Sequence, residues 1–202
     1  MPTEPQLPRG LYGIADSSFG QPVALAMLLA ESGCRVIQLR AKDWTTARRA
    51  DCARTLVERL GDQVCVVVND DVEAAAWSGA GGVHLGQEDG RLRAARLRLG
   101  PGALIGRSTH GLGDVARLEP DADYIGFGPV FPTSTKAAAG DARGIQLLSE
   151  VVRRASVPVV AIGGISLDNI AAVRATGVHS WAVISDIFRH PQPALRARQL
   201  HI

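Results

Sequence analysis

The run Val64-Cys65-Val66-Val67-Val68 is apolar at every position and is followed at once by Asn69-Asp70-Asp71. A strand with one buried face alternates apolar and polar residues, whereas a strand covered on both faces reads as a continuous apolar run. A second run without alternation spans residues 157–162. Both runs therefore predict strands of a parallel sheet that helices cover on each side.

Outward from these two runs, short segments rich in β-branched residues recur along the chain. Longer stretches with apolar residues at helical spacing separate them, such as 168–175 and 45–60, where Thr45 or Thr46 is the expected N-cap and Gly61 the expected end. A strand with its helix takes roughly 25 residues, which matches the spacing of the segments. The expected strands are 11–15, 36–39, 64–68, 83–85, 104–106, 124–126, 157–162 and 180–184.

Alternating strands and helices form either a closed barrel or an open doubly wound sheet. The open sheet that binds dinucleotides carries Gly-x-Gly-x-x-Gly after its first strand, and no such motif occurs near this N-terminus. Eight repeats in 202 residues fit the compact barrel better. We therefore predict an α/β fold, a single eight-stranded parallel (β/α)8 TIM barrel over residues 1–202, with 1–10 as an N-terminal arm.

The composition excludes several classes of partner. The formal net charge is only +2, which argues against nucleic acid or a membrane surface as the main partner. Aromatic residues make up only 4%, which argues against binding of nucleic-acid bases by stacking on aromatic side chains. No signal-peptide pattern begins the chain, and no apolar run approaches the roughly 18 residues of a membrane span. We expect a cytoplasmic protein, and a homo-oligomer is compatible with this sequence.

Polar, charged and glycine residues follow nearly every expected strand. In (β/α)8 barrels the residues just beyond the C-terminal ends of the strands line the active site. The strand exits therefore give the candidate functional residues. These segments are 38–42, 69–71, 84–89, 107–110, 128–136, 163–165 and 184–185.

Cations and hydroxyls form the first predicted subsite. Arg40, Lys42 and Lys136 follow the second and sixth strands, and Thr133 and Thr135 add hydroxyl donors. Several cations with hydroxyl groups suit a highly anionic group such as a diphosphate. A single lysine or arginine is more often a solvated surface charge, but the shared location at strand exits favours a binding role.

Two carboxylates form the second predicted subsite. Asp70 and Asp89 follow neighbouring strands, and beside a diphosphate such a pair can hold Mg²⁺. The alternative is that they cap helices, and we assign Asp71 to that structural role. His84 and His110 are expected to support the site, because a lone histidine is more often a satisfied second-layer residue than a ligand.

Glycines form the third predicted subsite. Gly163-Gly164 follows the seventh strand, and Ile184-Ser185 follows the eighth. Barrels of this kind frequently bind a phosphate group with the loops after these two strands, where backbone N–H groups point at the ligand. Together these exits predict a phosphomonoester site.

The motifs also resemble those of the thiamine-phosphate synthase family, from Leu11 to Ile187. The resemblance implies coupling of hydroxymethylpyrimidine diphosphate with hydroxyethyl-methylthiazole phosphate to give thiamine phosphate and diphosphate, with Mg²⁺. The segments Pro-Thr-x-Thr-Lys (132–136) and Gly-Gln-Glu-Asp (86–89) are its most specific parts. The matching motifs are Gln-Leu-Arg-x-Lys (38–42), Asn-Asp-x-Val (69–72), His-Leu-Gly-Gln-Glu-Asp (84–89), Gly-x-Ser-x-His (106–110), Gly-Pro-Val-Phe-Pro-Thr-x-Thr-Lys (128–136) and Ile-Gly-Gly-Ile (162–165).

The resemblance also implies roles for individual residues. Diphosphate would leave first, and the thiazole nitrogen would then attack a methylene cation stabilised by the aminopyrimidine. No general base is needed for that chemistry. The implied catalytic residues are Arg40, Lys42, Ser108 and Lys136. The implied positions are Gln38, Arg40, Lys42, Asn69, Ser108 and Lys136 on the pyrimidine diphosphate, Asp70 and Asp89 on the metal, and Thr133, Thr135, Gly164, Ile184 and Ser185 on the thiazole phosphate.

Other functions on the same barrel stay open. The related thiazole tautomerases resemble this chain at 137–144 and 106–108, but they typically lack the paired aspartates and carry a histidine where Pro129 stands. A sugar-phosphate isomerase would explain the glycine pair but not the cations and aspartates. A regulatory barrel could lose the cationic cluster, which this sequence keeps.

Overall fold

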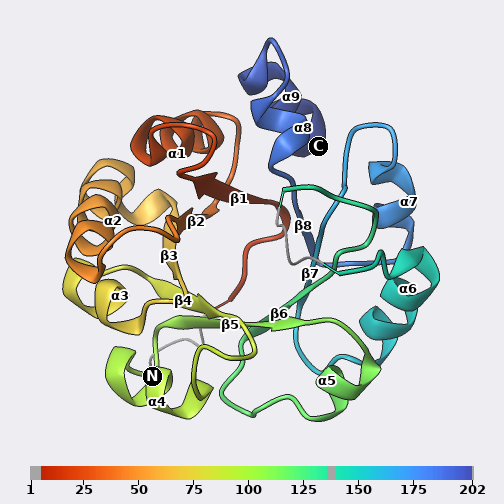
Figure 1. Ribbon diagram of the computed structural model, residues 1–202, viewed down its shortest axis with the longest axis horizontal. Coiled ribbons are helices and arrows are strands. Elements are labelled where there is room, and N and C mark those ends of the chain that lie inside the picture. The colour runs from red at the N-terminus through yellow and green to blue at the C-terminus, as the bar shows by residue number, and fades with distance from the viewer. Residues whose placement is uncertain (1–5, 136–139, 202) are drawn as a thin grey trace.

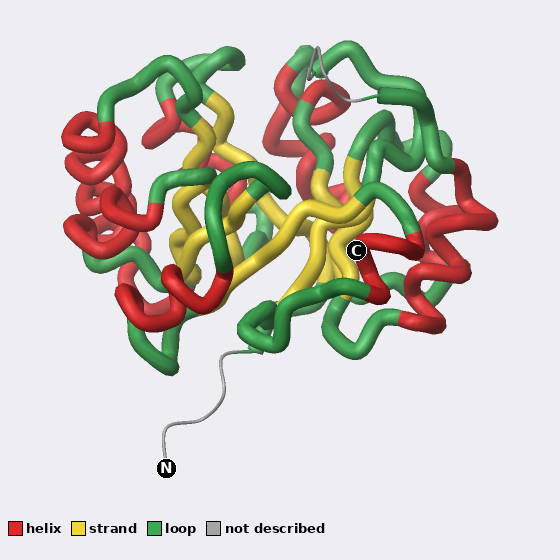
Figure 2. The backbone as a smooth tube through the Cα atoms, turned by 60° about the horizontal axis from the view of Figure 1, so that its bottom comes forward, coloured by secondary structure: helices red, strands yellow, loops and turns green. Residues whose placement is uncertain are grey.

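A closed ring of eight parallel strands forms the centre of the molecule. The computed structural model describes residues 6–135 and 140–201. Each strand pairs with the next one in chain order, and β1 pairs with β8 to close the sheet. Figure 1 shows the ring nearly end on with the helices outside it, and Figure 2 shows the strands enclosed between the helices. The predicted (β/α)8 barrel is confirmed.

Strands and helices alternate through the described chain. The strands are β1 (Gly10–Asp16), β2 (Val36–Arg40), β3 (Cys65–Asn69), β4 (Gly82–Leu85), β5 (Leu104–Thr109), β6 (Tyr124–Phe127), β7 (Val159–Ile162) and β8 (Ser180–Ala182). The helices are α1 (Pro22–Glu31), α2 (Thr46–Leu60), α3 (Val72–Ser78), α4 (Leu92–Leu99), α5 (Leu112–Ala116), α6 (Gly144–Arg154), α7 (Ile170–Ala175), α8 (Ser185–Phe188) and α9 (Pro193–His201), with a 3-10 turn, η1, at Gly61–Gln63.

Local boundaries follow the expected chemistry with small shifts. The Thr45 side chain accepts a hydrogen bond from the Arg48 N–H at 3.3 Å, and Gly61 ends α2, as expected. β7 begins two residues later than expected, because Pro158 has no N–H to donate to the sheet. β8 is shorter than expected, because Ile184 already precedes the first turn of α8.

Alternation along the strands separates two apolar layers. In β1, Leu11 and Ala15 belong to the layer between the strands and the helices. Tyr12 and Ile14 point the other way and pack inside the barrel, together with Val36, Val67, Leu104, Tyr124, Val160 and Ala182. The barrel is therefore a packed core rather than a pore.

The described part of the N-terminal arm packs against the N-terminal end of the barrel. Leu7 is buried and belongs to the inner layer. The carbonyl of Leu7 accepts from His179 Nε2 at 2.8 Å, and that of Pro8 accepts from Ser180 Oγ at 3.0 Å. The opposite end of the barrel carries the C-terminal ends of the parallel strands. No helix in residues 6–135 and 140–201 is long and apolar enough to span a membrane.

Gly82 marks the closest approach of β4 to β5. A Cβ atom there would lie 2.1 Å from the Leu104 carbonyl oxygen, so Gly82→Ala must displace backbone. We expect a loss of about 1–3 kcal/mol in the free energy of unfolding, measured by urea denaturation. Gly102→Ala is the control, because nothing lies within 4 Å of a Cβ at that position. Equal stability of the two variants would contradict this account of the packing.

Candidate active site

One cavity lies at the C-terminal ends of the strands. Every predicted site residue that the structure describes lines it, so the strand exits converge as expected. Lys136 lies outside the described residues. The predicted residues that line the cavity are Gln38, Arg40, Lys42, Asn69, Asp70, Asp89, Ser108, Thr133, Thr135, Gly164, Ile184 and Ser185.

Arg40 is fixed at the end of β2 by an ion pair with Asp16. Asp16 ends β1 and is only 2% exposed, and its second oxygen accepts from the backbone N–H of Ser18 at 2.9 Å and from the Ser18 hydroxyl at 2.7 Å. β1 and β2 pair in a register that sets Asp16 opposite Arg40. The guanidinium therefore reaches the cavity with its orientation already determined.

Lys42 and the two threonines lie at the rim. Lys42 is exposed and lines the cavity beside Arg40. Thr133 accepts a hydrogen bond from the Thr135 N–H at 3.3 Å, so the two residues share one turn. The described residues thus bring two cations and two hydroxyls to one opening, a combination suited to phosphate oxygens.

Asp70 and Asp89 come together from β3 and from the loop after β4. Burial raises the pKa of the Asp89 carboxyl, and the adjacent Asp70 carboxyl raises it further, while the Gly86 N–H and the Lys42 charge lower it. Two carboxyl groups this close repel each other when both are ionised. A divalent cation relieves that repulsion, so the pair fits Mg²⁺.

The number of acidic ligands leaves room for other oxygens. Among the described residues no group of three or more His, Cys, Asp or Glu side chains is placed to hold a metal ion. Mg²⁺ usually binds through one or two carboxylates and completes its shell with water and substrate phosphate. The Asp70–Asp89 pair matches that mode rather than an all-protein cage.

Three local features hold the pair in place. Asp70 has φ 62°, in the left-handed region that few residues other than glycine adopt. Gly86 donates its N–H to Asp89 Oδ2 at 2.9 Å, and a Cβ on Gly86 would lie 2.6 Å from the same oxygen. Arg107 is 8% exposed and donates to the carbonyls of Gly86 and Gly90, which fixes the loop that carries Asp89.

Asp71 has a structural role. Its Oδ1 accepts from the Ala74 N–H at 2.9 Å, which caps α3, and its Oδ2 pairs with Arg49 at 2.8 Å. The assignment of Asp71 to helix capping is confirmed. Asn69 and Asp70 therefore line the cavity, whereas the next residue, Asp71, caps the helix.

Glycines are required where the loop after β7 meets the loop after β6. Gly163 and Gly164 have φ values of 97° and 64°. A Cβ at Gly163 would lie 2.5 Å from Pro129, and one at Gly164 would lie 2.5 Å from the Pro132 carbonyl oxygen. Backbone, rather than side chains, therefore forms this wall of the cavity, as a site for a phosphate group requires.

A chain of hydrogen bonds crosses the floor of the cavity. Gln38 Nε2 donates to Tyr12 Oη at 3.0 Å, and Tyr12 Oη lies 2.8 Å from Tyr124 Oη. Tyr124 Oη lies 3.1 Å from His84 Nδ1, and His84 Nε2 lies 3.0 Å from Ser108 Oγ. His84 thus supports Ser108 as expected. His110 is also bonded, with Nδ1 2.6 Å from the Gly128 carbonyl oxygen.

Sequence reasoning missed Asp16 and the two floor tyrosines, and it placed Arg107 at a strand exit without assigning it a role. Asp16 stands at the exit of the first strand, so the same strand-exit rule would have found it there. Tyr12 and Tyr124 lie inside strands, and their aromatic side chains read as core residues until the barrel shows which face is inward.

Comparisons with known proteins indicate the family that this chain resembles. A family model described as "Thiamine monophosphate synthase" matches residues 11–187. The thiamine-phosphate synthase of Myxococcus xanthus is 41% identical over 98% of this chain and 94% of its own, and that of Methanocella arvoryzae is 41% identical over 94% and 92%. The structure titled thiamine phosphate pyrophosphorylase from Pyrococcus furiosus superposes with a TM-score of 0.84 at 33% identity, over 95% of this chain and 93% of that one.

More distant structures share only the fold. Phosphoribosyl anthranilate isomerase from Thermotoga maritima superposes with a TM-score of 0.69 at 15% identity, over 96% of this chain and 97% of that one. A likeness at that level of identity indicates a common barrel and says nothing about the reaction.

We expect Asp16→Asn to destabilise the protein and to release Arg40. Removing one partner of a largely buried ion pair leaves the other charge uncompensated, and the side chains are 2% and 17% exposed. The expected loss in the free energy of unfolding is about 2–4 kcal/mol, measured by urea denaturation. Asp51→Asn is the matched control, because its pair with Arg54 is exposed and should contribute little. A variant as stable as this control would remove the assigned role of Asp16.

Proposed function

The chain belongs to the thiamine-phosphate synthase family, and we propose that the cavity at the C-terminal ends of its strands carries out the family's coupling reaction. The enzyme joins a phosphorylated pyrimidine to a phosphorylated thiazole to give thiamine phosphate. One observation supports the proposed place of the reaction most strongly. All the predicted site residues that the structure describes line the same cavity.

Within this proposal the cations hold the leaving diphosphate. As the bond between the pyrimidine methylene carbon and the diphosphate oxygen breaks, negative charge grows on the departing oxygens. Arg40 is held in place by Asp16, so it can interact with that charge without reorganising, and Lys42 lines the same cavity. Lys136 is the third cation of this proposed subsite.

The Asp70–Asp89 pair is the proposed Mg²⁺ site. When bound there, the ion would neutralise part of the diphosphate charge. Asp70 and Asp89 would hold it weakly alone, because two carboxylates supply only part of its coordination shell. The raised pKa of the Asp89 carboxyl beside Asp70 supports a shared cation at this position.

The remaining residues would position the two rings. We assign Gln38, Asn69 and Ser108 to the pyrimidine, because all three line the cavity and Gln38 and Ser108 belong to the hydrogen-bond chain of its floor. Thr133 and Thr135, together with the backbone at Gly164, Ile184 and Ser185, are assigned to the thiazole phosphate. Holding the thiazole nitrogen in line with the methylene carbon makes the second step effectively unimolecular.

A coupling assay tests the proposed reaction directly. Purified protein with hydroxymethylpyrimidine diphosphate, hydroxyethyl-methylthiazole phosphate and Mg²⁺ should form thiamine phosphate and release one diphosphate per product. Rapid isomerisation of a thiazole without coupling would instead favour the tautomerase function. The proline at position 129 and the bonding of His110 to the Gly128 carbonyl both argue against a histidine base.

Asp89→Asn should raise the Mg²⁺ concentration needed for half-maximal activity by about tenfold or more, because one anionic ligand is lost. Initial rates measured over a Mg²⁺ titration give this value. The control is Asp71→Asn, which changes a neighbouring aspartate that caps α3 and should leave the Mg²⁺ requirement unchanged. Full turnover of the unmodified enzyme in excess chelator would refute the metal assignment.

Lys136→Ala should slow the chemical step by roughly two to three decades, since one donor to developing charge is worth about 2.7–4 kcal/mol. The chain contains two lysines, Lys42 and Lys136, and twenty arginines, so lysine occurs only at positions assigned to the diphosphate. This usage fits a need for a compact ammonium group, and Lys136→Arg should restore little activity. Single-turnover rates with both substrates saturating provide the measurement. A bond-forming rate near that of the unmodified enzyme would show that Lys136 is a solvated surface charge.

A further inference from the structure

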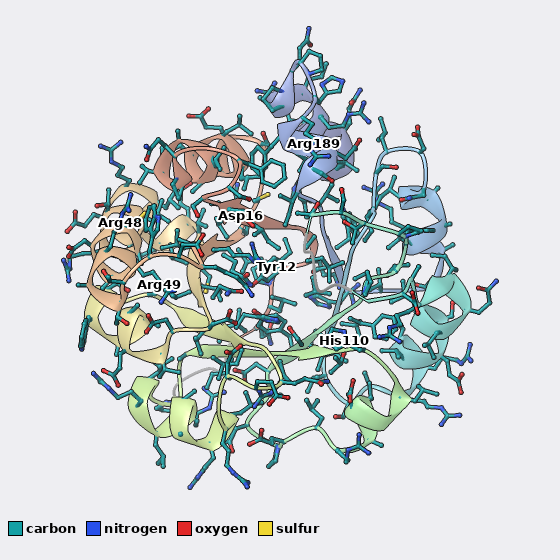
Figure 3. All side chains as sticks on the ribbon, in the orientation of Figure 1. Tyr12, Asp16, Arg48, Arg49, His110 and Arg189 are labelled. Atoms are coloured by element: carbon teal, nitrogen blue, oxygen red, sulfur yellow. The ribbon has the colours of Figure 1, made fainter. Side chains whose placement is uncertain are left out.

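The floor of the cavity contains a continuous hydrogen-bond chain whose direction can be worked out proton by proton. It runs from Gln38 through Tyr12, Tyr124 and His84 to Ser108. Figure 3 places Tyr12 at the centre of the ring of strands. Every contact in the chain is between 2.8 and 3.1 Å. Each hydroxyl carries one proton, and a buried hydroxyl proton needs an acceptor, so the donor at one end of such a chain sets the direction of the rest.

The Gln38 end sets the direction. An amide nitrogen can only donate, so Tyr12 Oη accepts from Gln38 Nε2. The proton of the buried Tyr12 hydroxyl then needs an acceptor, which Tyr124 Oη provides. Tyr124 must then donate to His84 Nδ1. Burial raises the pKa of both tyrosines, which keeps these protons on the hydroxyls.

The hydrogen bond that His84 accepts at Nδ1 determines which atom donates in its contact with Ser108. Because His84 Nδ1 accepts, the neutral ring carries its proton on Nε2, and Nε2–H donates to Ser108 Oγ. The single proton of Ser108 is then free to point elsewhere, and Ser108 lines the cavity. The space for this arrangement depends on Gly106, where a Cβ would lie 2.2 Å from the Tyr124 ring and 2.5 Å from His84 Nδ1.

We propose that Gln38, acting through Tyr12, Tyr124 and His84, holds Ser108 as a hydrogen-bond donor to the substrate. His84 is a positioning residue in its neutral Nε2–H form. The group of the substrate that faces Ser108 is therefore an acceptor, such as a ring nitrogen or a phosphoryl oxygen, and not an amino group. The link to substrate rests on the proposed function, whereas the state of His84 is a property of the resting protein.

The protonation state of His84 can be read directly. Protein labelled with ¹⁵N at its histidines is examined by long-range ¹H–¹⁵N NMR without substrate, above the ordinary histidine pKa of about 6.5. Two histidines in the same chain are internal references. Carbonyl oxygens only accept, so His110 must carry its proton on Nδ1 and His179 on Nε2. We expect His84 to match His179. A match to His110 would overturn the proposal.

Two variants test whether the chain controls this state. Gln38→Met removes the initial donor, and Tyr124→Phe removes the donor to Nδ1. In each variant the His84 signals should shift toward a mixture of the two neutral forms. Unchanged His110 and His179 signals would show that the barrel is intact. A His84 signal that stays purely Nε2–H in both variants would show that the chain does not set its state.

Coupling kinetics test the step from His84 to Ser108. We expect His84→Ala and Ser108→Ala each to lower kcat/KM by roughly two- to tenfold, the range for one lost hydrogen bond. His84→Gln keeps an N–H donor and should retain more activity than His84→Ala. In the double variant His84→Ala with Ser108→Ala, the losses should not multiply, because His84 acts through Ser108. Multiplying losses would overturn the proposal, while failure of the coupling reaction in the unmodified enzyme would count against the proposed function instead.

Discussion

The ladder between β1 and β8 is the constraint on which the site depends. Leu11 pairs with Trp181 and Tyr12 with Ala182, and this pairing turns an open row of parallel strands into a ring. In a closed parallel barrel all the C-terminal strand ends lie on one rim, so residues from every part of the chain reach the same space. The inner layer then fills the barrel below the rim, with Leu7 at its N-terminal end.

Charge is arranged in opposed groups around that rim. Asp16 holds Arg40, and the positive charge of Lys42 lowers the pKa of Asp89 while Asp70 raises it. The Arg40 guanidinium is held in place by a buried carboxylate, and the Lys42 charge offsets part of the repulsion between the Asp70 and Asp89 carboxyl groups. Such fixed charges do not need to reorganise when the charge of a substrate changes.

Much of this arrangement is predictable from the sequence, and the limits have physical causes. The apolar run at 64–68 identified a buried strand, and the polar residues after it identified a wall of the cavity. A strand that is buried on both faces is apolar at every position, so the first polar residues after it mark where the chain leaves the barrel. Asp16 was missed only because the first strand exit was passed over.

Other features depend on three-dimensional relations that no local pattern carries. Tyr12 and Tyr124 read as ordinary core residues, and only the register of the closed barrel shows that both face inward and meet. Arg107 reads as a strand-exit cation but turns back to bind the carbonyls of the loop that holds Asp89. Arg107 also pairs with Glu119 at 2.8 Å, so its charge is compensated within the protein. Sequence position alone does not distinguish these two uses of an arginine.

The contact between Tyr12 and Tyr124 joins positions 112 residues apart, and it has a consequence for how the molecule acquires activity. A nascent or refolding chain must bring its two halves together before this contact exists, and loop closure over such a distance carries an entropic penalty. No half-barrel contains a complete cavity floor. A ligand that needs the complete floor would therefore bind the fully closed barrel. Such binding would shift the folding equilibrium towards the closed barrel and away from states in which its two halves are apart.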